Sequence, residues 1–148
     1  MISVVIPCYR SSKTIEKVVN LTAAELDRLG RYDYEFVLVD DCSPDNGATA
    51  AVLQKLSEEH PYVKSILLAR NAGQHNALMA ALNYASGDTL IGMDDDMQTH
   101  PSQLQYLLAE FDKGYDIVYG YYPEKKHSGF RNFGSYINYL SVRILIGK

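Results

Sequence analysis

Short apolar runs alternate with segments of helical periodicity along most of the chain, and this alternation restricts the possible folds more than any other feature. The five runs are rich in β-branched residues and are bounded by turn residues; they span residues 2–7, 34–40, 63–69, 89–93 and 116–120. Such runs are typical of buried parallel strands. The segments between them repeat apolar residues every three or four positions, as amphipathic helices do. The pattern predicts an α/β fold, a mostly parallel sheet with helices on both faces.

Turn and cap residues predict where the helices begin. Ser43, Pro44 and Asp45 have the order of an N-cap, a first-turn proline and an early acid. The sequence at 100–102, His-Pro-Ser, is expected to open the fourth helix. Residues 1–120 are therefore predicted to form the α/β domain.

Composition excludes several classes of protein. The chain has 148 residues, 47% of them apolar, and a net charge of −4, which argues against a general nucleic-acid binder. The first residues lack the basic start and long apolar stretch of a secretory signal, and no run of the given sequence approaches the ~20 apolar residues of a membrane span. Cys8 and Cys42 fit no metal-ligand spacing, and reduced, partly buried thiols in a cytoplasmic protein are the expectation.

The apolar C-terminal stretch ends abruptly. Residues 136–147 are apolar at helical spacing and stop at Lys148, so a helix there has little to pack against. We expect residues 121–148 to be a loop and the incomplete start of a further segment of the same domain, C-terminally truncated. The sequence leaves a homo-oligomer open.

Polar residues follow four of the predicted strands, at 7–10, 40–41, 70–71 and 94–98. In open parallel sheets, ligands bind beyond the carboxyl ends of the strands, near the point where the strand order reverses. We therefore expect one crevice to collect these residues.

The acidic triplet after the fourth predicted strand is the strongest candidate for a ligand site. Asp94 and Asp96 project to the same face of an extended segment. Their carboxylates and the amide of Gln98 suit Mg²⁺ or Mn²⁺, with phosphate oxygens and water as further ligands. The alternative is a solvated acidic turn, but adjacent acids repel one another unless a cation compensates them. Asp95 projects the other way, towards backbone groups or the edge of a ligand.

The first two strand ends carry candidate nucleoside contacts. Asp40 and Asp41 could accept hydrogen bonds from a base N–H or a ribose hydroxyl. Capping of the next helix is the alternative, although Ser43 is already placed for that. Tyr9, which follows Pro7 in the turn after the first strand, could stack on a base or lie half-buried at the surface.

Basic residues and a glycine could contact phosphate. Gly73 permits a sharp turn and close approach to a ligand, and the helix N-terminus behind it favours anions. Arg70 is equally compatible with a phosphate contact and a surface salt bridge. Lys125 and Lys126 could neutralise a diphosphate or an anionic membrane surface, but a solvated loop is the simpler interpretation.

Four ordered stretches resemble family 2 glycosyltransferases with the GT-A fold. They are Ile2-Ser-Val-Val-Ile-Pro-Cys-Tyr, Val37-Leu-Val-Asp-Asp-Cys-Ser-Pro-Asp, Arg70-Asn-Ala-Gly-Gln-His-Asn-Ala and Gly87-Asp-Thr-Leu-Ile-Gly-Met-Asp-Asp-Asp-Met-Gln. The Gly-Gln-His-Asn-Ala and Asp-x-Asp-x-Gln stretches further resemble the polyprenyl-phosphate glycosyltransferases, a group that includes dolichyl-phosphate mannose synthase. Family members are normally longer than this chain.

The resemblance implies an inverting, metal-dependent transfer of a sugar from a nucleotide diphosphate sugar to undecaprenyl or dolichyl phosphate, at the cytoplasmic face of a membrane. It implies that Asp94, Asp96 and Gln98 hold the metal. Arg131 resembles an arginine of the group that approaches donor or acceptor phosphate, so Asp96 and Arg131 are the expected catalytic residues. With the loop residues above, the predicted nucleotide-binding set is Pro7, Tyr9, Asp40, Asp41, Arg70, Gly73, Asp94 and Asp95.

The alternatives to this function are another family 2 enzyme, a non-catalytic binding fragment and a receiver domain. A family 2 enzyme with a saccharide hydroxyl acceptor would need a carboxylate base further along the chain. A non-catalytic sugar-nucleotide-binding fragment would bind nucleotide and metal without transfer. A response-regulator receiver would need an acid pair after the first strand and a phosphorylatable Asp after the third. Cys8, Tyr9, Arg70 and Asn71 occupy those places instead.

Overall fold

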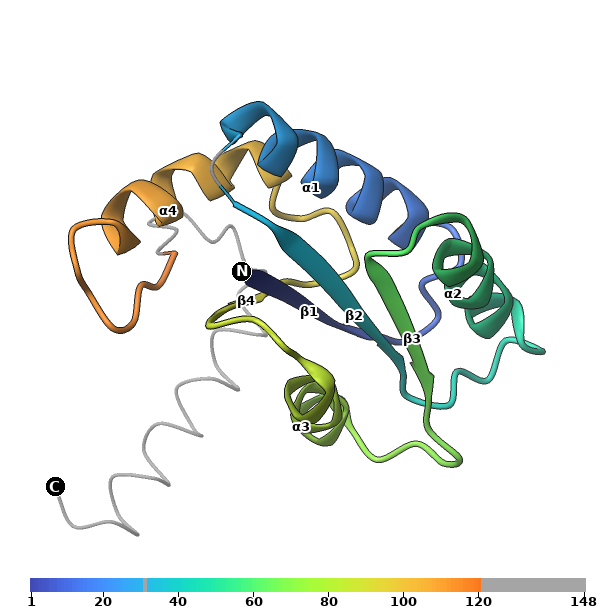
Figure 1. The fold of residues 1–148 in the computed structure, drawn as a ribbon. Helices are drawn as coiled ribbons and strands as arrows, with labels where there is room; N and C mark the ends of the chain where they lie inside the picture. Colours follow the sequence, from blue (N-terminus) through green and yellow to red (C-terminus); the bar gives the residue numbers. More distant parts are fainter. Residues whose placement is uncertain (31, 121–148) are drawn as a thin grey trace, which may run out of the picture. The chain divides into compact units, whose positions relative to one another are not determined.

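A four-stranded parallel sheet forms the centre of the structure, a computed structural model that describes residues 1–30 and 32–120 (Figure 1). Its strands are β1 (Ile2–Cys8), β2 (Tyr34–Asp40), β3 (Val63–Leu67) and β4 (Thr89–Gly92), in the spatial order β3-β2-β1-β4. All four belong to the unit Met1–Asp116; of the second unit, Ile117–Lys148, only residues 117–120 are described.

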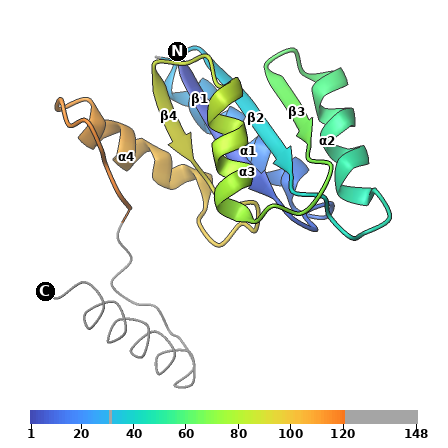
Figure 2. The ribbon, with the colours of Figure 1, turned by 90° about the horizontal axis from the view of Figure 1, so that it is seen from below.

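Helices cover both faces of the sheet, as the sequence predicts. The helices are α1 (Ile15–Leu29), α2 (Ala48–Glu59), α3 (Gln74–Tyr84) and α4 (Leu104–Phe111), and a 3₁₀ turn, η1 (Pro101–Gln103), leads into α4. Figure 1 shows α1, α2 and α4 on one side of the sheet and α3 on the other, and the view from below in Figure 2 places α3 across the strands. Within the described part of the chain, no helix has the length and apolar character needed to span a membrane.

The alternation of side chains along β1 produces two hydrophobic cores. Val4 and Ile6 face one side and pack with apolar residues of α1, α2 and α4. Val5 faces the other side and packs with Ala77 and Ala81 of α3. Successive strand residues point to opposite faces, so a strand covered on both sides must be apolar at nearly every position.

The strand order reverses next to β1. The chain passes from β1 to β2 and β3 on one side, and β4 then returns to pair with β1 on the other side. The carboxyl ends of β1 and β4 therefore flank the switch point, where open α/β sheets bind ligands.

The predicted fifth strand is wrong for the described residues. Residues 115–120 have no regular secondary structure, and Ile117 and Tyr119 are 68% and 84% exposed. An apolar run becomes a strand only where a neighbouring strand takes its backbone hydrogen bonds.

Helix α2 begins later than the cap signals predict. Asn46 and Gly47 adopt positive φ values of 56° and 80°, which breaks the helical path, so α2 starts at Ala48. Asp45 still serves the helix start, because it accepts a hydrogen bond from the Thr49 N–H at 3.0 Å. Ser43 is not a cap; its hydroxyl donates to Asp40 Oδ1 at 2.5 Å. The expected start at 100–102 is confirmed as η1.

A buried carboxylate organises the amino ends of the strands. Glu35 is 7% exposed and accepts hydrogen bonds from Ser3 Oγ at 2.6 Å and the Ser86 N–H at 2.5 Å, and Lys64 Nζ lies 2.7 Å away. The Gly87 N–H donates to the same Ser3 hydroxyl, and a Cβ at this position would lie 2.8 Å from it. These contacts join β1, β2 and β3 to the loop that leads into β4.

The contacts of Glu35 should make the free energy of unfolding depend on pH in the acidic range. Burial raises the pKa of Glu35, but hydrogen bonds from Lys64, Ser3 and Ser86 outweigh burial and lower the pKa from 4.5 to about 2. Because the folded pKa is the lower one, the stabilisation is complete above about pH 4.5 and is lost as the pH falls towards 2. We expect a contribution of about 2 kcal/mol at pH 6.

Urea unfolding of the wild type and Glu35→Gln at pH 6 and pH 3 measures this contribution. The difference in free energy of unfolding should shrink in acid. The exposed Glu58→Gln is the control. A difference that is the same at both pH values would contradict the role of the Glu35 charge.

Candidate functional site

A pocket of about 520 Å³ opens at the carboxyl ends of the strands, at the switch point. Eight of the predicted site residues line it: Pro7, Tyr9, Asp41, Gly73, Asp94, Asp95, Asp96 and Gln98. Cys8, Asn71 and Gln74 complete the lining. Residues from the β1, β2, β3 and β4 ends therefore meet in one place, as the parallel topology requires.

The acidic loop, residues 94–98, leaves β4 with alternating exposure. Asp94 and Asp96 are exposed, whereas Asp95 between them is partly buried. The loop then turns at Met97, whose φ is 61°, and Asp96 Oδ1 accepts a hydrogen bond from the Gln98 N–H at 3.0 Å. Gln74 Nε2 lies 3.4 Å from Asp94 Oδ1, a long and weak contact.

The partly buried member of the triplet contacts the turn between β1 and α1. Asp95 Oδ2 accepts hydrogen bonds from the Tyr9 N–H at 3.0 Å and from the Ser11 hydroxyl. The acidic loop and the turn that carries Tyr9 are thus directly joined.

Asp41 shapes the loop between β3 and α3. It is 4% exposed, and its two oxygens accept hydrogen bonds from the Ala72 N–H at 2.7 Å and the Gly73 N–H at 2.8 Å. Gly73 has φ 88°, a conformation that side chains disfavour. Each carboxylate oxygen has a second lone pair, so Asp41 can hold the loop and still accept a bond from a ligand.

Tyr9 presents a partly exposed ring at the edge of the pocket. It is 48% exposed, and the Arg10 guanidinium lies 5.7 Å from the ring centroid. A ring with one accessible face can stack on a planar base.

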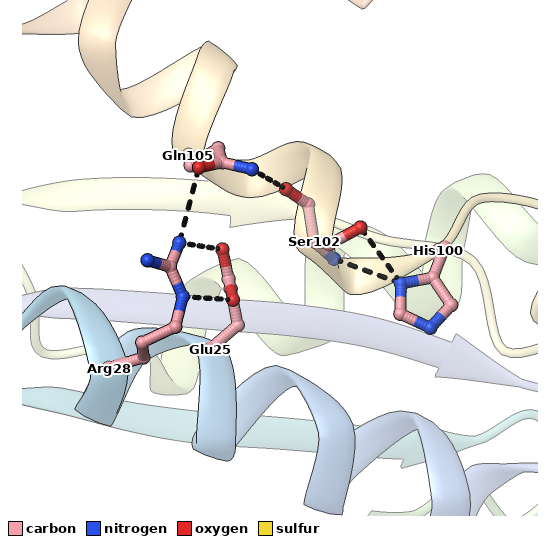
Figure 3. Close-up of polar contacts among 5 residues, drawn as sticks. All are labelled: Glu25, Arg28, His100, Ser102 and Gln105. Atoms are coloured by element: carbon pink, nitrogen blue, oxygen red, sulfur yellow. Dashed lines mark hydrogen bonds and ion pairs between the residues drawn. The ribbon is translucent and has the colours of Figure 1, made fainter.

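A polar cluster on α1 and α4, which we call the α1–α4 cluster, anchors the chain after the acidic loop (Figure 3). Its members are Glu25, Arg28, His100, Ser102 and Gln105. Arg28 makes two hydrogen bonds with Glu25, at 2.8 and 2.9 Å, and donates to Gln105 Oε1 at 3.2 Å. His100 Nδ1 accepts from the Ser102 N–H at 3.2 Å and caps η1. Hydrogen bonding to Arg28 lowers the pKa of Glu25, which keeps this bridge ionised.

The pocket is strongly acidic. Asp41, Asp94, Asp95 and Asp96 line it, and within the described residues the lining contains no lysine or arginine. A phosphate group could not lie beside these carboxylates without a compensating cation.

The donor set fits Mg²⁺ or Mn²⁺ bound together with a phosphate ligand. In the part of the chain that the structure describes, no group of three His, Cys, Asp or Glu side chains is arranged to hold a metal. Two exposed carboxylates, Asp94 and Asp96, and the amide of Gln98 provide only oxygen donors. Mg²⁺ is commonly held by one or two carboxylates, with substrate phosphates and water completing the shell.

Two predicted site residues among those the structure describes, Asp40 and Arg70, do not line the pocket. Asp40 is 5% exposed and accepts hydrogen bonds from the N–H and hydroxyl of Ser43, so it stabilises the turn after β2. Arg70 is exposed and does not line the pocket. Arg131 lies outside the described residues, as do Lys125 and Lys126.

The two cysteines are free, as expected, but only Cys8 is buried; Cys42 is exposed. Burial and the charges of Asp95 and Asp40 raise the pKa of the Cys8 thiol. Cys8 therefore lines the pocket as a protonated thiol, which is a poor nucleophile.

Comparison with known proteins agrees with this geometry. The model of the family described as glycosyl transferase family 2 matches residues 3–145. The chain belongs to this family. Its mostly parallel sheet, covered by helices on both faces, is the GT-A fold of that family.

Two solved structures are similar to this chain over part of their length. A mannosyltransferase from Pyrobaculum calidifontis, solved with GDP-Man and Mn²⁺, is 28% identical with a TM-score of 0.55, over 64% of this chain and 27% of that one. S. aureus TarS 1-349 is 25% identical with a TM-score of 0.59, over 83% of this chain and 40% of that one. The same TarS segment was also solved with UDP-GlcNAc. The chain thus spans less than half the length of these proteins.

Sequence reasoning missed residues that connect the loops. Ser11 is 3% exposed and bonds Asp95, although no motif marks it. Gln74, whose amide lies 3.4 Å from Asp94 Oδ1, was missed as well, although a search of the polar stretch after β3 for amides could have found it. Asn71, one of the polar strand ends expected in the crevice, does line the pocket and donates its amide N–H to the Asp41 carbonyl at 3.1 Å.

Proposed function

We propose that this chain is the donor-binding part of an inverting, metal-dependent glycosyltransferase that moves a sugar from a nucleotide diphosphate sugar to a polyprenyl phosphate. The observation that carries the proposal is the acidic pocket at the switch point, with Asp94 and Asp96 exposed together and no basic residue in its described lining. Such a pocket accepts a diphosphate only together with a cation.

The donor class is supported by the pocket and by the neighbours. In this proposal Tyr9 stacks on the base, and Asp41 accepts a hydrogen bond from a base N–H or a ribose hydroxyl; both residues line the pocket. The backbone at Gly73 leaves room for the diphosphate beside α3. The similar structures carry GDP-Man with Mn²⁺ or UDP-GlcNAc, ligands of this class.

Asp94, Asp96 and Gln98 are the proposed metal ligands. When bound, Mg²⁺ or Mn²⁺ supplies positive charge that stabilises the leaving nucleoside diphosphate. Asp94, Asp96 and Gln98 would act on the diphosphate through the cation that they hold. Asp95 lines the pocket between them. Arg131 remains a prediction from the sequence; a cation there would stabilise charge on donor or acceptor phosphate.

In the transfer step, an oxygen of the acceptor phosphate forms a bond to the anomeric carbon. The bond from that carbon to the donor diphosphate breaks, and its electron pair leaves with the nucleoside diphosphate. Attack from the opposite side inverts the anomeric centre. The acceptor phosphate, with a second pKa of about 6, is already mostly ionised near neutral pH and needs no strong general base. The Gly-Gln-His-Asn-Ala and Asp-x-Asp-x-Gln stretches favour this acceptor, whose lipid would place the reaction at the cytoplasmic face of a membrane.

A transfer assay with the full-length protein tests the acceptor. With Mn²⁺ and the sugar nucleotide that binds most tightly among UDP, GDP and dTDP sugars, we expect labelled sugar to appear on undecaprenyl or dolichyl phosphate. Omitting Mn²⁺ and adding a chelator should remove the product. Undecaprenol, which has the same chain without the phosphate, is the matched control.

Two results would separate the parts of the proposal. Transfer only to free saccharides would exclude the polyprenyl phosphate acceptor but keep the donor site. Metal-dependent nucleotide binding without transfer to either acceptor would indicate a non-catalytic binding protein.

A further inference from the structure

We infer that Asp95 is a positioning residue, which holds the acidic loop against the β1–α1 turn and acts on the diphosphate site through that loop. This inference rests on the proposed function and sharpens it, because it separates the middle carboxylate of the triplet from its two neighbours. Asp95 does not ligate the metal; it sets the direction in which Asp94 and Asp96 point.

Asp95, Tyr9 and Ser11 are joined to one another by three hydrogen bonds. Asp95 Oδ2 accepts hydrogen bonds from the Tyr9 N–H and the Ser11 hydroxyl, and the same Tyr9 N–H lies 2.9 Å from Ser11 Oγ. Residues 95–99 form a bend in which exposure alternates, with Asp94 and Asp96 more exposed than Asp95 between them. Tying Asp95 to the protein therefore holds the two outer carboxylates at the pocket that they line.

The anchor continues into the protein interior. Ser11 is 3% exposed, and its N–H donates to Thr49 Oγ1 at 3.0 Å. Thr49 is fully buried and donates in turn to Asp45 Oδ2 at 2.6 Å. A buried and mutually bonded chain of this kind holds its members in one arrangement. The loop is thereby tied to the start of α2 as well as to the end of β1.

Within the acidic loop, Met97 packs against the larger hydrophobic core, but the polar ties other than those of Asp95 are weaker or lie at the ends of the loop. Before the loop, the Met93 N–H donates to the Val5 carbonyl at 3.1 Å. After it, the α1–α4 cluster fixes η1 and α4. Between these ends, the contact of Gln74 with Asp94 is long, at 3.4 Å. Asp95 accepts two hydrogen bonds, and that from the Tyr9 N–H is shorter, at 3.0 Å, so Asp95 is the main polar attachment of the loop centre among the described contacts.

Removing the anchor should weaken diphosphate binding more than nucleoside binding. Without it, the loop must be ordered each time the metal and diphosphate bind. Asp95→Ala and Ser11→Ala should each weaken Mn²⁺-dependent nucleoside diphosphate binding about 10- to 30-fold. Affinity for the corresponding nucleoside without phosphates should change less than about threefold, because Asp95 bonds the Tyr9 backbone and not its ring, and Asp41 lies outside this loop. Asp95→Asn keeps an acceptor oxygen and should retain most of the diphosphate affinity.

Calorimetry on the full chain measures these affinities, with UDP, GDP and dTDP as probes in the presence of Mn²⁺. Asp88→Ala is the matched control, since it removes a carboxylate that is 92% exposed at the opposite end of β4. Hydrogen exchange of the ligand-free protein gives an independent readout. The Tyr9 amide should exchange faster in Asp95→Ala than in the wild type or Asp88→Ala.

The outcomes separate the possible roles. If Ser11→Ala binds like the wild type while Asp95→Ala and Asp95→Asn both lose affinity, Asp95 is a direct ligand and the inference is wrong. Equal weakening of diphosphate and nucleoside, or unchanged Tyr9 exchange, would also overturn it. If the wild type binds none of the three diphosphates with Mn²⁺, the proposed function fails first, and Tyr9 exchange still decides whether the anchor exists.

Discussion

Replacing Asp96 with alanine is expected to raise the Kd of Mn²⁺-dependent nucleoside diphosphate binding at least about 100-fold, or roughly 2.8 kcal/mol. Asp94 and Asp96 are the two exposed carboxylates of the acidic loop, and both line the pocket. With one removed, a divalent cation keeps a single carboxylate and the Gln98 amide. The loss of a charged ligand weakens cation binding, and without the cation the three remaining pocket carboxylates repel the diphosphate.

The metal-free state provides the sharper test. In the presence of a chelator, the four pocket carboxylates repel a diphosphate, so wild-type binding should be weak. Asp96→Ala removes one repelling charge and should bind the diphosphate without metal at least as well as the wild type. Calorimetry with Mn²⁺ and with chelator measures both states, and Asp88→Ala serves as the control. A variant that loses equal affinity in the two conditions would show that Asp96 does not act through a metal.

The second large effect is expected at Asp41. Asp41→Ala removes the buried carboxylate that accepts hydrogen bonds from the Ala72 and Gly73 N–H groups, which should lower the free energy of unfolding by about 2–4 kcal/mol. The loop between β3 and α3 also loses the contact that shapes its side of the pocket. Nucleotide binding should therefore fall together with stability.

Asp41→Asn separates the two hydrogen bonds. The amide offers one acceptor oxygen in place of two, so about half of the loss in stability should return. Urea unfolding of both variants, with the exposed Asp88→Ala for comparison, measures the effect. A cost for Asp41→Ala no greater than that for Asp88→Ala would mean that solvent satisfies the two N–H groups.

Local patterns predicted most of the fold. The apolar, β-branched runs became β1 to β4 because both faces of these strands are covered, which requires nearly continuous apolar sequence. The run at 116–120 has the same character but is no strand, because strand formation depends on a pairing partner that a local pattern does not contain. The start of α2 was misplaced for a similar reason. The left-handed residues Asn46 and Gly47 delay the helix despite favourable cap residues upstream.

The candidate site was predictable where it depends on strand ends. Parallel strands bring their carboxyl ends to one edge, so Tyr9, Asp41, Gly73 and the acidic loop could be grouped without coordinates. Arg70 and Asp40 also follow strands, yet one is exposed and the other is buried in its own turn. Position in the sequence does not determine which way a loop side chain points.

The sequence by itself determined the succession of strands and helices, the polar strand ends and the shared direction of Asp94 and Asp96, because each follows from the spacing of neighbouring residues. Only the tertiary structure decided that Asp95 bonds Ser11, which is 84 residues away, and that Asp41 holds a loop 31 residues further along the chain. Such contacts depend on the order of strands in the sheet. The placement of β4 beside β1 brings the acidic loop to the β1–α1 turn.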